Sequence, residues 1–220
     1  RTQRLGQIIA GFGILFVGMG LMSEAMVPLR ENEHFLTAMQ SVGSSPLLDV
    51  LVGAAITTVI QSSSASVALT QVLAGQGLIP LEMAIYVCLG CAIGTCVTAM
   101  LASVGTGPTA RRAAVVHLLF NIAGAALMLL ILRALPLASW MRALSPNDVK
   151  RQIANANTLM RLAEVALLFP LANVLIKASG WLVRGEEPKG EERKLAYLDD
   201  LILTTPPIAV AQVLKEVERM

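Results

Sequence analysis

Two long stretches without a charged residue limit the fold of this chain more than any other feature of its sequence. Residues 50–81 and 83–110 contain no Asp, Glu, Lys or Arg, and Glu82 alone separates them. Over all 220 residues, 55% are hydrophobic and 15% are charged, with a mean hydropathy of +0.67. Soluble domains carry about 25% charged residues, so the sequence predicts an all-α integral membrane protein. The net charge of +2 comes from basic residues at segment ends and does not indicate a nucleic-acid surface.

Four consecutive polar residues, Gln61-Ser62-Ser63-Ser64, interrupt the first uncharged stretch. The apolar arms on either side are each shorter than the roughly 20 residues that a spanning helix needs. Polar or irregular backbone at membrane depth is tolerated only where it is buried in protein or lines a wet cavity. We therefore expect a re-entrant helical hairpin over about 46–74, with the polar cluster at the break between two half-length helices.

Four further apolar segments predict helices that cross the membrane, over about 5–29, 81–104, 113–132 and 154–183. Within the second of these, the run Gly94-Thr95-Cys96-Val97-Thr98 predicts a broken helix, unwound near its middle. In the last, Pro170 predicts a kink. Arg161 and Glu164 are three residues apart, a spacing that allows an ion pair on one helix face.

The composition changes sharply after the last predicted span. Residues 184–197 form a charged linker, and 198–220 contain the start of an amphipathic helical domain that is not completed. With the predicted spans, eight basic residues fall on the side of this linker and five on the other, which favours a cytoplasmic C-terminus. Because the chain opens at Arg1 and stops within a predicted helix at Met220, we expect it to be a piece of a longer protein.

Five motifs follow one another along the chain: Gly53 to Ala65, Ile93-Gly94-Thr95, Thr98-Ala99, Arg111 to Ala114 and His117 to Asn121. In this order and at this spacing they resemble the type II sodium/phosphate cotransporter family. The resemblance is clear over about residues 5–135 and loose beyond them. It implies one of two inverted repeats, each with its own Gln-Ser-Ser-Ser, and this chain resembles the second repeat of the bacterial members. Those proteins continue into a cytoplasmic PhoU-like domain, which 198–220 resembles at its beginning.

The resemblance implies sodium-coupled secondary transport of inorganic phosphate across the inner (cytoplasmic) membrane by alternating access. It implies no enzymatic activity and no cofactor, with Na⁺ as the coupling ion. Because one repeat supplies only one wall of an occluded site, the expected partner is a missing first repeat or a second copy of the chain in a homodimer. A different class of function stays open, namely a non-transporting phosphate sensor or scaffold that acts through its cytoplasmic helical tail.

The chemistry of phosphate gives the polar cluster its expected role. With no fixed cation near the cluster, an oxyanion site has to use hydroxyls, backbone N–H groups and helix N-termini. Gln61 can donate to phosphate or offer its carbonyl oxygen to sodium. The resemblance extends these roles to two threonines. The candidate phosphate ligands are Gln61, Ser62, Ser63, Ser64 and Thr98, and the candidate sodium ligands are Gln61 and Thr95.

For three other sets of residues, we expect a structural role or a weakened sodium site. The family usually has asparagine where this chain has Ala92, which has no side-chain oxygen for Na⁺. His117 and Asn121 share a helix face, and a structural role is favoured over a proton relay. The cysteines lie in apolar runs without a nearby histidine, so we expect helix packing rather than metal binding; they are Cys88, Cys91 and Cys96.

Overall fold

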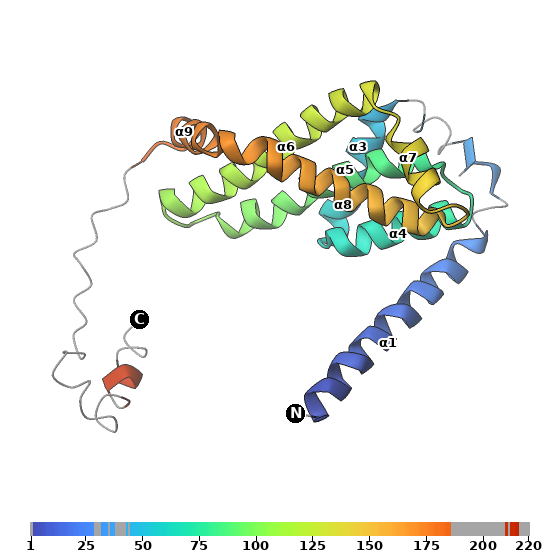
Figure 1. Ribbon diagram of the computed structural model, residues 1–220. Coiled ribbons are helices and arrows are strands. Elements are labelled where there is room, and N and C mark those ends of the chain that lie inside the picture. The colour runs from blue at the N-terminus through green and yellow to red at the C-terminus, as the bar shows by residue number, and fades with distance from the viewer. Residues whose placement is uncertain are drawn as a thin grey trace. The chain divides into compact units, whose positions relative to one another are not determined.

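A computed structural model describes residues 2–28, 32–34, 36–37, 43, 45–185, 210 and 212–215. The described residues form helices and turns and contain no strand (Figure 1), which confirms the predicted all-α class. The chain divides into two units, Arg1–Val183 and Arg184–Met220. In the second unit Val210 and residues 212–215 are helical, and most of the predicted PhoU-like segment, 198–220, lies outside the described residues.

The described part of the first unit contains four helical stretches long and apolar enough to cross a membrane, at Arg4–Ala25, Leu81–Ala102, Pro108–Ala134 and Val149–Leu182. The four predicted spans fall on these stretches, as expected for a multi-pass membrane protein. The elements are α1 (Thr2–Ala25), α3 (Pro46–Ile60), α4 (Ser63–Gly75), α5 (Leu81–Ala102), α6 (Pro108–Ala134), α7 (Leu137–Leu144), α8 (Val149–Leu168), η2 (Phe169–Leu171) and α9 (Ala172–Leu182).

Helix α5 lies at the centre of the first unit. Half of its most apolar window is buried, whereas at most 17% of the corresponding window is buried in the other three spanning candidates. It contacts α3, α4, α6 and α8, which lie around it in Figure 1. Its Cys88 and Leu89 are fully buried in the core that also contains Ile153 and Met160 of α8. The other three long helices therefore turn most of their apolar surface outward, as lipid-facing helices do.

Glycines bring α3 and α5 into backbone contact. A Cβ added at Gly90 would overlap the carbonyl oxygen of Val50, and one added at Gly94 would lie 2.5 Å from the carbonyl oxygen of Ala54. Gly90 and Gly94 thus form a Gly-x-x-x-Gly pair, the arrangement that lets membrane helices approach closely. Because residue numbers rise together along both helices at this contact, α3 and α5 run parallel.

The predicted break in the 81–104 span is wrong, because α5 is one continuous helix from Leu81 to Ala102. The threonine hydroxyls bond to backbone carbonyls of the same helix. Thr95 Oγ1 donates to the carbonyl of Cys91 at 2.8 Å, and Thr98 Oγ1 donates to that of Thr95 at 2.6 Å. Gly94 allows the close approach of α3 and does not mark an unwound turn. The helix also lacks proline, the residue that most often breaks one.

The predicted interruption at the polar cluster is present. Helix α3 ends at Ile60, and Gln61 has left-handed backbone angles of φ 61° and ψ 20°. Its N–H donates to the carbonyl of Thr57 at 2.7 Å, which closes the helix. Ser62 then caps α4 by accepting a hydrogen bond from the N–H of Ala65 at 3.3 Å. The chain therefore reverses over two residues, Gln61 and Ser62, between two half-length helices.

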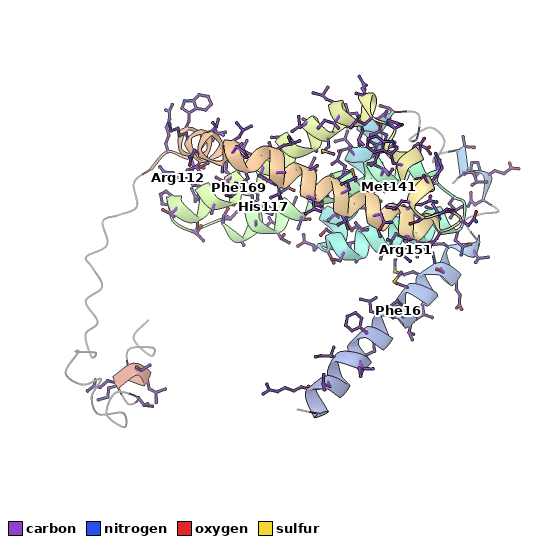
Figure 2. The ribbon with its side chains drawn as sticks, viewed as in Figure 1. Phe16, Arg112, His117, Met141, Arg151 and Phe169 are labelled. Carbon is purple, nitrogen blue, oxygen red and sulfur yellow. The ribbon has the colours of Figure 1, made fainter. Side chains whose placement is uncertain are left out.

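The last spanning stretch is interrupted at the predicted proline. Pro170 lies in η2, a single 3₁₀ turn between α8 and α9. The far end of this stretch is tied to α6, since Arg112 Nε donates to the carbonyl of Val183 at 3.2 Å. Arg112 is labelled in Figure 2. The beginning of α6 and the end of α9 consequently lie together.

Candidate functional site

A cavity of about 460 Å³ lies among α4, α5, α6 and α8. Its lining combines apolar side chains with a set of hydroxyls, amides, an imidazole and an ion pair. The polar members of the lining are Ser63, Ser64, Gln71, Thr95, His117, Asn121, Asn157, Arg161 and Glu164. A polar cavity of this kind inside an apolar helical protein is the usual setting of a substrate site.

The first turn of α4 contributes Ser63 and Ser64 to the cavity. The first N–H groups of a helix have no partner within the helix, and they carry a partial positive charge. Ser62 uses its own hydroxyl to cap this turn, so it supports the turn rather than lining the cavity. The start of α4 therefore offers two serine hydroxyls at the end of a helix that favours an anion.

Two further predicted ligands lie outside the lining. Gln61 turns back on α3, where its Nε2 donates to the carbonyl of Thr58 at 3.1 Å. Thr98 lies one turn beyond the cavity and bonds within α5. The cavity thus brings together Ser63, Ser64 and Thr95 from the predicted set.

Helix α5 contributes Cys91, Ala92 and Thr95 to one wall. The hydroxyl hydrogen of Thr95 is used in the bond to Cys91, which leaves its oxygen free to accept a hydrogen bond or to bind a cation. Ala92, three residues earlier, lines the same wall and presents only a methyl group. Around the described cavity no group of three or more His, Cys, Asp or Glu residues could hold a metal ion.

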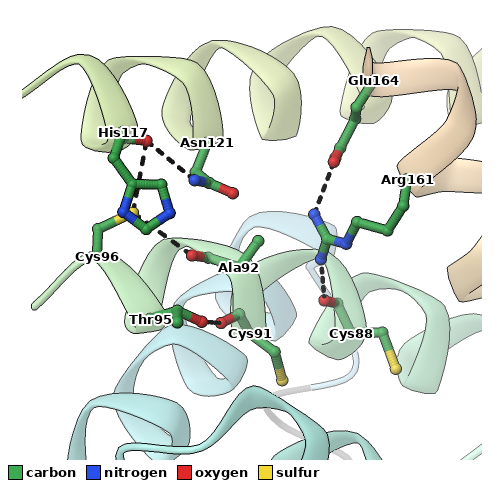
Figure 3. A network of polar contacts seen from close by, with 9 residues as sticks. All are labelled: Cys88, Cys91, Ala92, Thr95, Cys96, His117, Asn121, Arg161 and Glu164. Carbon is green, nitrogen blue, oxygen red and sulfur yellow. Dashed lines mark hydrogen bonds and ion pairs between the residues drawn. The ribbon is translucent and has the colours of Figure 1, made fainter. Parts of the chain in front are cut away.

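Helix α6 adds His117 and Asn121, which share a face at the i,i+4 spacing. Asn121 Nδ2 donates to the carbonyl of His117 at 2.9 Å, and the thiol of Cys96 approaches the same carbonyl at 3.6 Å (Figure 3). These bonds use the backbone of His117 and leave its ring facing the cavity. The three cysteines are free thiols and buried, as packing residues are.

Helix α8 supplies the charged part of the cavity, which the sequence did not assign to the site. Arg161 Nη1 donates to Glu164 Oε2 at 2.6 Å, which confirms that these two residues pair. Arg161 Nη2 donates to the carbonyl of Cys88 at 2.9 Å and so joins α8 to α5 (Figure 3). The cavity therefore contains a fixed cation, contrary to the expectation that a site here has none. The sequence did indicate these residues, because Arg161 and Glu164 lie within an apolar span. Charged residues in such a span usually serve a function.

Two buried acceptor atoms near this pair have no hydrogen-bond partner in the described structure. They are Glu164 Oε1 and Asn157 Oδ1, both from the α8 residues that line the cavity. Buried polar atoms are nearly always bonded, so unbonded acceptors on residues that line a cavity mark places where a ligand, ion or water would bind. Taken together, the lining has donors suited to an oxyanion and acceptors suited to a cation.

Comparisons with known proteins agree on one family. The sequence profile described as Na⁺/Pi-cotransporter matches residues 27–166, more than half of the chain. "Uncharacterized protein YqeW" of Bacillus subtilis is 32% identical over 175 residues, which are 80% of this chain and 56% of that protein. "Putative inorganic phosphate export protein YjbB" of Salmonella typhimurium is 28% identical over 221 residues, all of this chain and 40% of that protein.

A shorter match extends to mammals. "Sodium-dependent phosphate transport protein 2C" of Mus musculus is 41% identical over 91 residues, which are 40% of this chain and 15% of that protein. The chain thus spans about half the length, or less, of these relatives. No solved structure matches the chain.

Proposed function

Because the chain belongs to the Na⁺/Pi-cotransporter family, we propose that it forms part of a secondary transporter that moves inorganic phosphate together with Na⁺ across the cell membrane by alternating access. The observation that carries this proposal is the polar cavity among α4, α5, α6 and α8. Phosphate has up to four acceptor oxygens and one to two negative charges near neutral pH. Hydroxyls, helix N-termini and a guanidinium are the groups that bind such an anion in proteins.

In this proposal the phosphate lies at the first turn of α4, against Ser63 and Ser64. The helix end favours the negative charge, and the serine hydroxyls donate to the phosphate oxygens. The surrounding apolar residues strengthen these interactions, since electrostatic attraction grows as water is excluded. Val67, Phe120 and Val165 supply that apolar surface.

We propose that α3 and α4 form a re-entrant hairpin. Helix α3 has 15 residues and α4 has 13, and at 1.5 Å per residue each is about 20 Å long, short of the roughly 30 Å hydrocarbon core. Helix α3 runs parallel to α5, and residues 76–80 connect α4 directly to the beginning of α5. This topology supports a hairpin that enters and leaves on one side, with the Gln61–Ser62 reversal at its inner end.

The coupling ion in the proposal is Na⁺, held on α5 and at the hairpin reversal. Thr95 provides a hydroxyl oxygen in the cavity that is free to accept. Gln61 provides a side-chain carbonyl at the reversal, outside the lining of the cavity. A cation and a phosphate in one site each offset the desolvation cost of the other, because burying an unpaired charge is costly. Joint occupancy is therefore favoured over single occupancy, which is what coupled transport requires.

The setting proposed for this site is the inner membrane, with the C-terminal unit in the cytoplasm, as the distribution of basic residues favours. One relative is named for phosphate export and another for sodium-dependent transport. The same site serves either direction, because net flux follows the gradients of phosphate and of the coupled ion. The other wall of the pathway comes from a second hairpin, in a further repeat or in a second copy of the chain.

Phosphate uptake into membrane vesicles that contain the native protein tests the proposal. We expect radiolabelled phosphate to accumulate when an inward sodium gradient is imposed, and accumulation to fall to background when the gradient is collapsed. Replacing Ser63 by alanine removes a hydrogen bond to a charged ligand, worth about 1.5–3 kcal/mol, so the half-saturating phosphate concentration should rise about tenfold or more.

Ser139→Ala is the matched control, because Ser139 is exposed on α7 and lies outside the cavity. It should leave uptake unchanged at equal amounts of inserted protein. Equal uptake in the Ser63 and Ser139 variants would exclude the cavity as the phosphate site. Phosphate binding without uptake under any gradient would instead support the sensor or scaffold function.

A further inference from the structure

The charged wall of the cavity points to a second group for the anion, separate from the serines of α4. Asn157, Arg161 and Glu164 follow one another along α8 at spacings of four and three residues, so they share one helix face, and all three line the cavity. This face contacts α5 through the bond from Arg161 to the carbonyl of Cys88. The wall is therefore a built feature of the packed helices rather than a loose surface charge.

Arg161 has N–H donors that its two bonds to Glu164 and Cys88 do not use. A guanidinium has five N–H donors, and in the described structure Arg161 uses one Nη for Glu164 and the other for Cys88. Its side chain is 32% exposed, whereas that of Glu164 is 3% exposed. The arginine thus faces the open space while its carboxylate partner lies behind it. An arginine in this position suits an oxyanion, since its planar fork matches carboxylate and phosphate alike.

Glu164 binds Arg161 through one oxygen only. Oε2 accepts the 2.6 Å bond, and Oε1 is buried without a partner. A buried pair that was optimised for stability alone would have both oxygens satisfied. The carboxylate instead binds the guanidinium of Arg161 as a phosphate would. Its unbonded Oε1 stays available to bind a second cation.

Resting on the function proposed above, we propose that Arg161 is a phosphate ligand that exchanges between Glu164 in the empty cavity and phosphate in the loaded one. Phosphate competes with Glu164 for the guanidinium. When the arginine turns to phosphate, Glu164 is left buried and negative, and it then needs a cation at its free Oε1. The exchange therefore ties binding of the anion to binding of a cation at Glu164 on α8, in addition to the Na⁺ proposed on α5.

Equilibrium binding of radiolabelled inorganic phosphate to the purified native protein tests this exchange. In Glu164→Gln the competing carboxylate is gone, so phosphate should bind about fivefold or more tighter than in the unaltered protein. The double variant Arg161→Gln/Glu164→Gln keeps the cavity uncharged and avoids an unpaired buried carboxylate. It should bind phosphate about tenfold or more weaker than Glu164→Gln, as expected for loss of a charge-assisted hydrogen bond.

Arg151→Gln is the matched control, since Arg151 is an exposed arginine on the same helix outside this cavity. It should bind phosphate as the unaltered protein does. A purely structural ion pair predicts weaker or unchanged phosphate binding for Glu164→Gln, and either result in a folded Glu164→Gln protein would overturn the exchange. Loss of binding in Ser63→Ala with full affinity in the double variant would refute the role of Arg161 and leave the proposed function standing. Absence of phosphate binding in the unaltered protein would refute both.

Discussion

Ala92 is the residue at which we expect this chain to depart from the pattern of the type II cotransporters, which it otherwise resembles. It lines the cavity on the same face of α5 as Thr95, three residues away. Na⁺ is a hard cation that prefers oxygen ligands, and a methyl group offers none. The cation site proposed here therefore has one side-chain oxygen fewer than the asparagine of related proteins would give.

Ala92→Asn should strengthen sodium activation of phosphate uptake. The added amide oxygen lies next to the free oxygen of Thr95, and one such ligand worth about 1 kcal/mol lowers the half-saturating sodium concentration about fivefold. Uptake measured against sodium concentration gives this value. Ala92→Leu, with similar size and no oxygen, should show no gain. Equal sodium curves for the two variants would mean that the coupled cation is bound elsewhere.

Part of the candidate site could be predicted from residue types alone, and part could not. Ser63 and Ser64 line the cavity, and a polar run inside an uncharged stretch was sufficient to single them out. Thr95 lines it as well, but its role was predicted only from the family resemblance. Arg161 and Glu164 were predicted as a pair but not as part of the site. Their membership depends on which face of α8 turns toward α5, a contact between residues 73 positions apart.

At the scale of helices, the sequence predicted the break at Gln61 correctly and the break in α5 wrongly. Both segments contain small and hydroxyl-bearing residues in an apolar run. They differ in what surrounds them: Gln61 adopts a left-handed conformation and Ser62 caps a new helix, whereas Gly94 accommodates α3. A glycine followed by a threonine is compatible with an unwound turn and with close packing, and only the neighbouring helix decides between them.

The contact between α3 and α5 gives a prediction at this scale. Gly90→Ala puts a methyl group onto the backbone of Val50, so the two helices have to separate, at a cost of about 1–3 kcal/mol. We expect a lower thermal unfolding midpoint for the protein in detergent. Gly180→Ala is the control, because nothing lies within 4 Å of an added Cβ there and alanine favours a helix. A Gly90 variant as stable as the Gly180 variant would show that the two helices tolerate separation.

At the scale of the whole molecule, the proposed transporter needs a second wall for its pathway. Val59 is 82% exposed beside the reversal at the inner end of α3, and Gln61 next to it is exposed as well. At membrane depth an exposed glutamine side chain and free helix ends are costly in lipid. We therefore expect a second hairpin to cover this end in the native assembly.

Cysteine cross-linking tests this expectation. After replacement of Cys88, Cys91 and Cys96 by alanine, Val59→Cys should cross-link to a second hairpin, from another repeat or another copy of the chain. The products distinguish the two, because a link between copies doubles the mass of the band on a denaturing gel. Trp181→Cys is the control, since Trp181 is 75% exposed on α9, away from the reversal. Cross-linking that is equal at both positions, or absent at Val59, would contradict a hairpin partner.

The glycine contact between α3 and α5 has a mechanical consequence for a transporter. Two backbones in direct contact have no layer of side chains that can repack between them, so the two helices cannot slide past one another without separating. The hairpin must then travel with α5 as a single rigid block. Any change that opens the cavity to one side of the membrane and then to the other has to come from the side-chain-mediated contacts of this block with α6 and α8. We expect distance changes between spin labels to be concentrated across those contacts, and the α3–α5 distance to stay constant throughout the cycle.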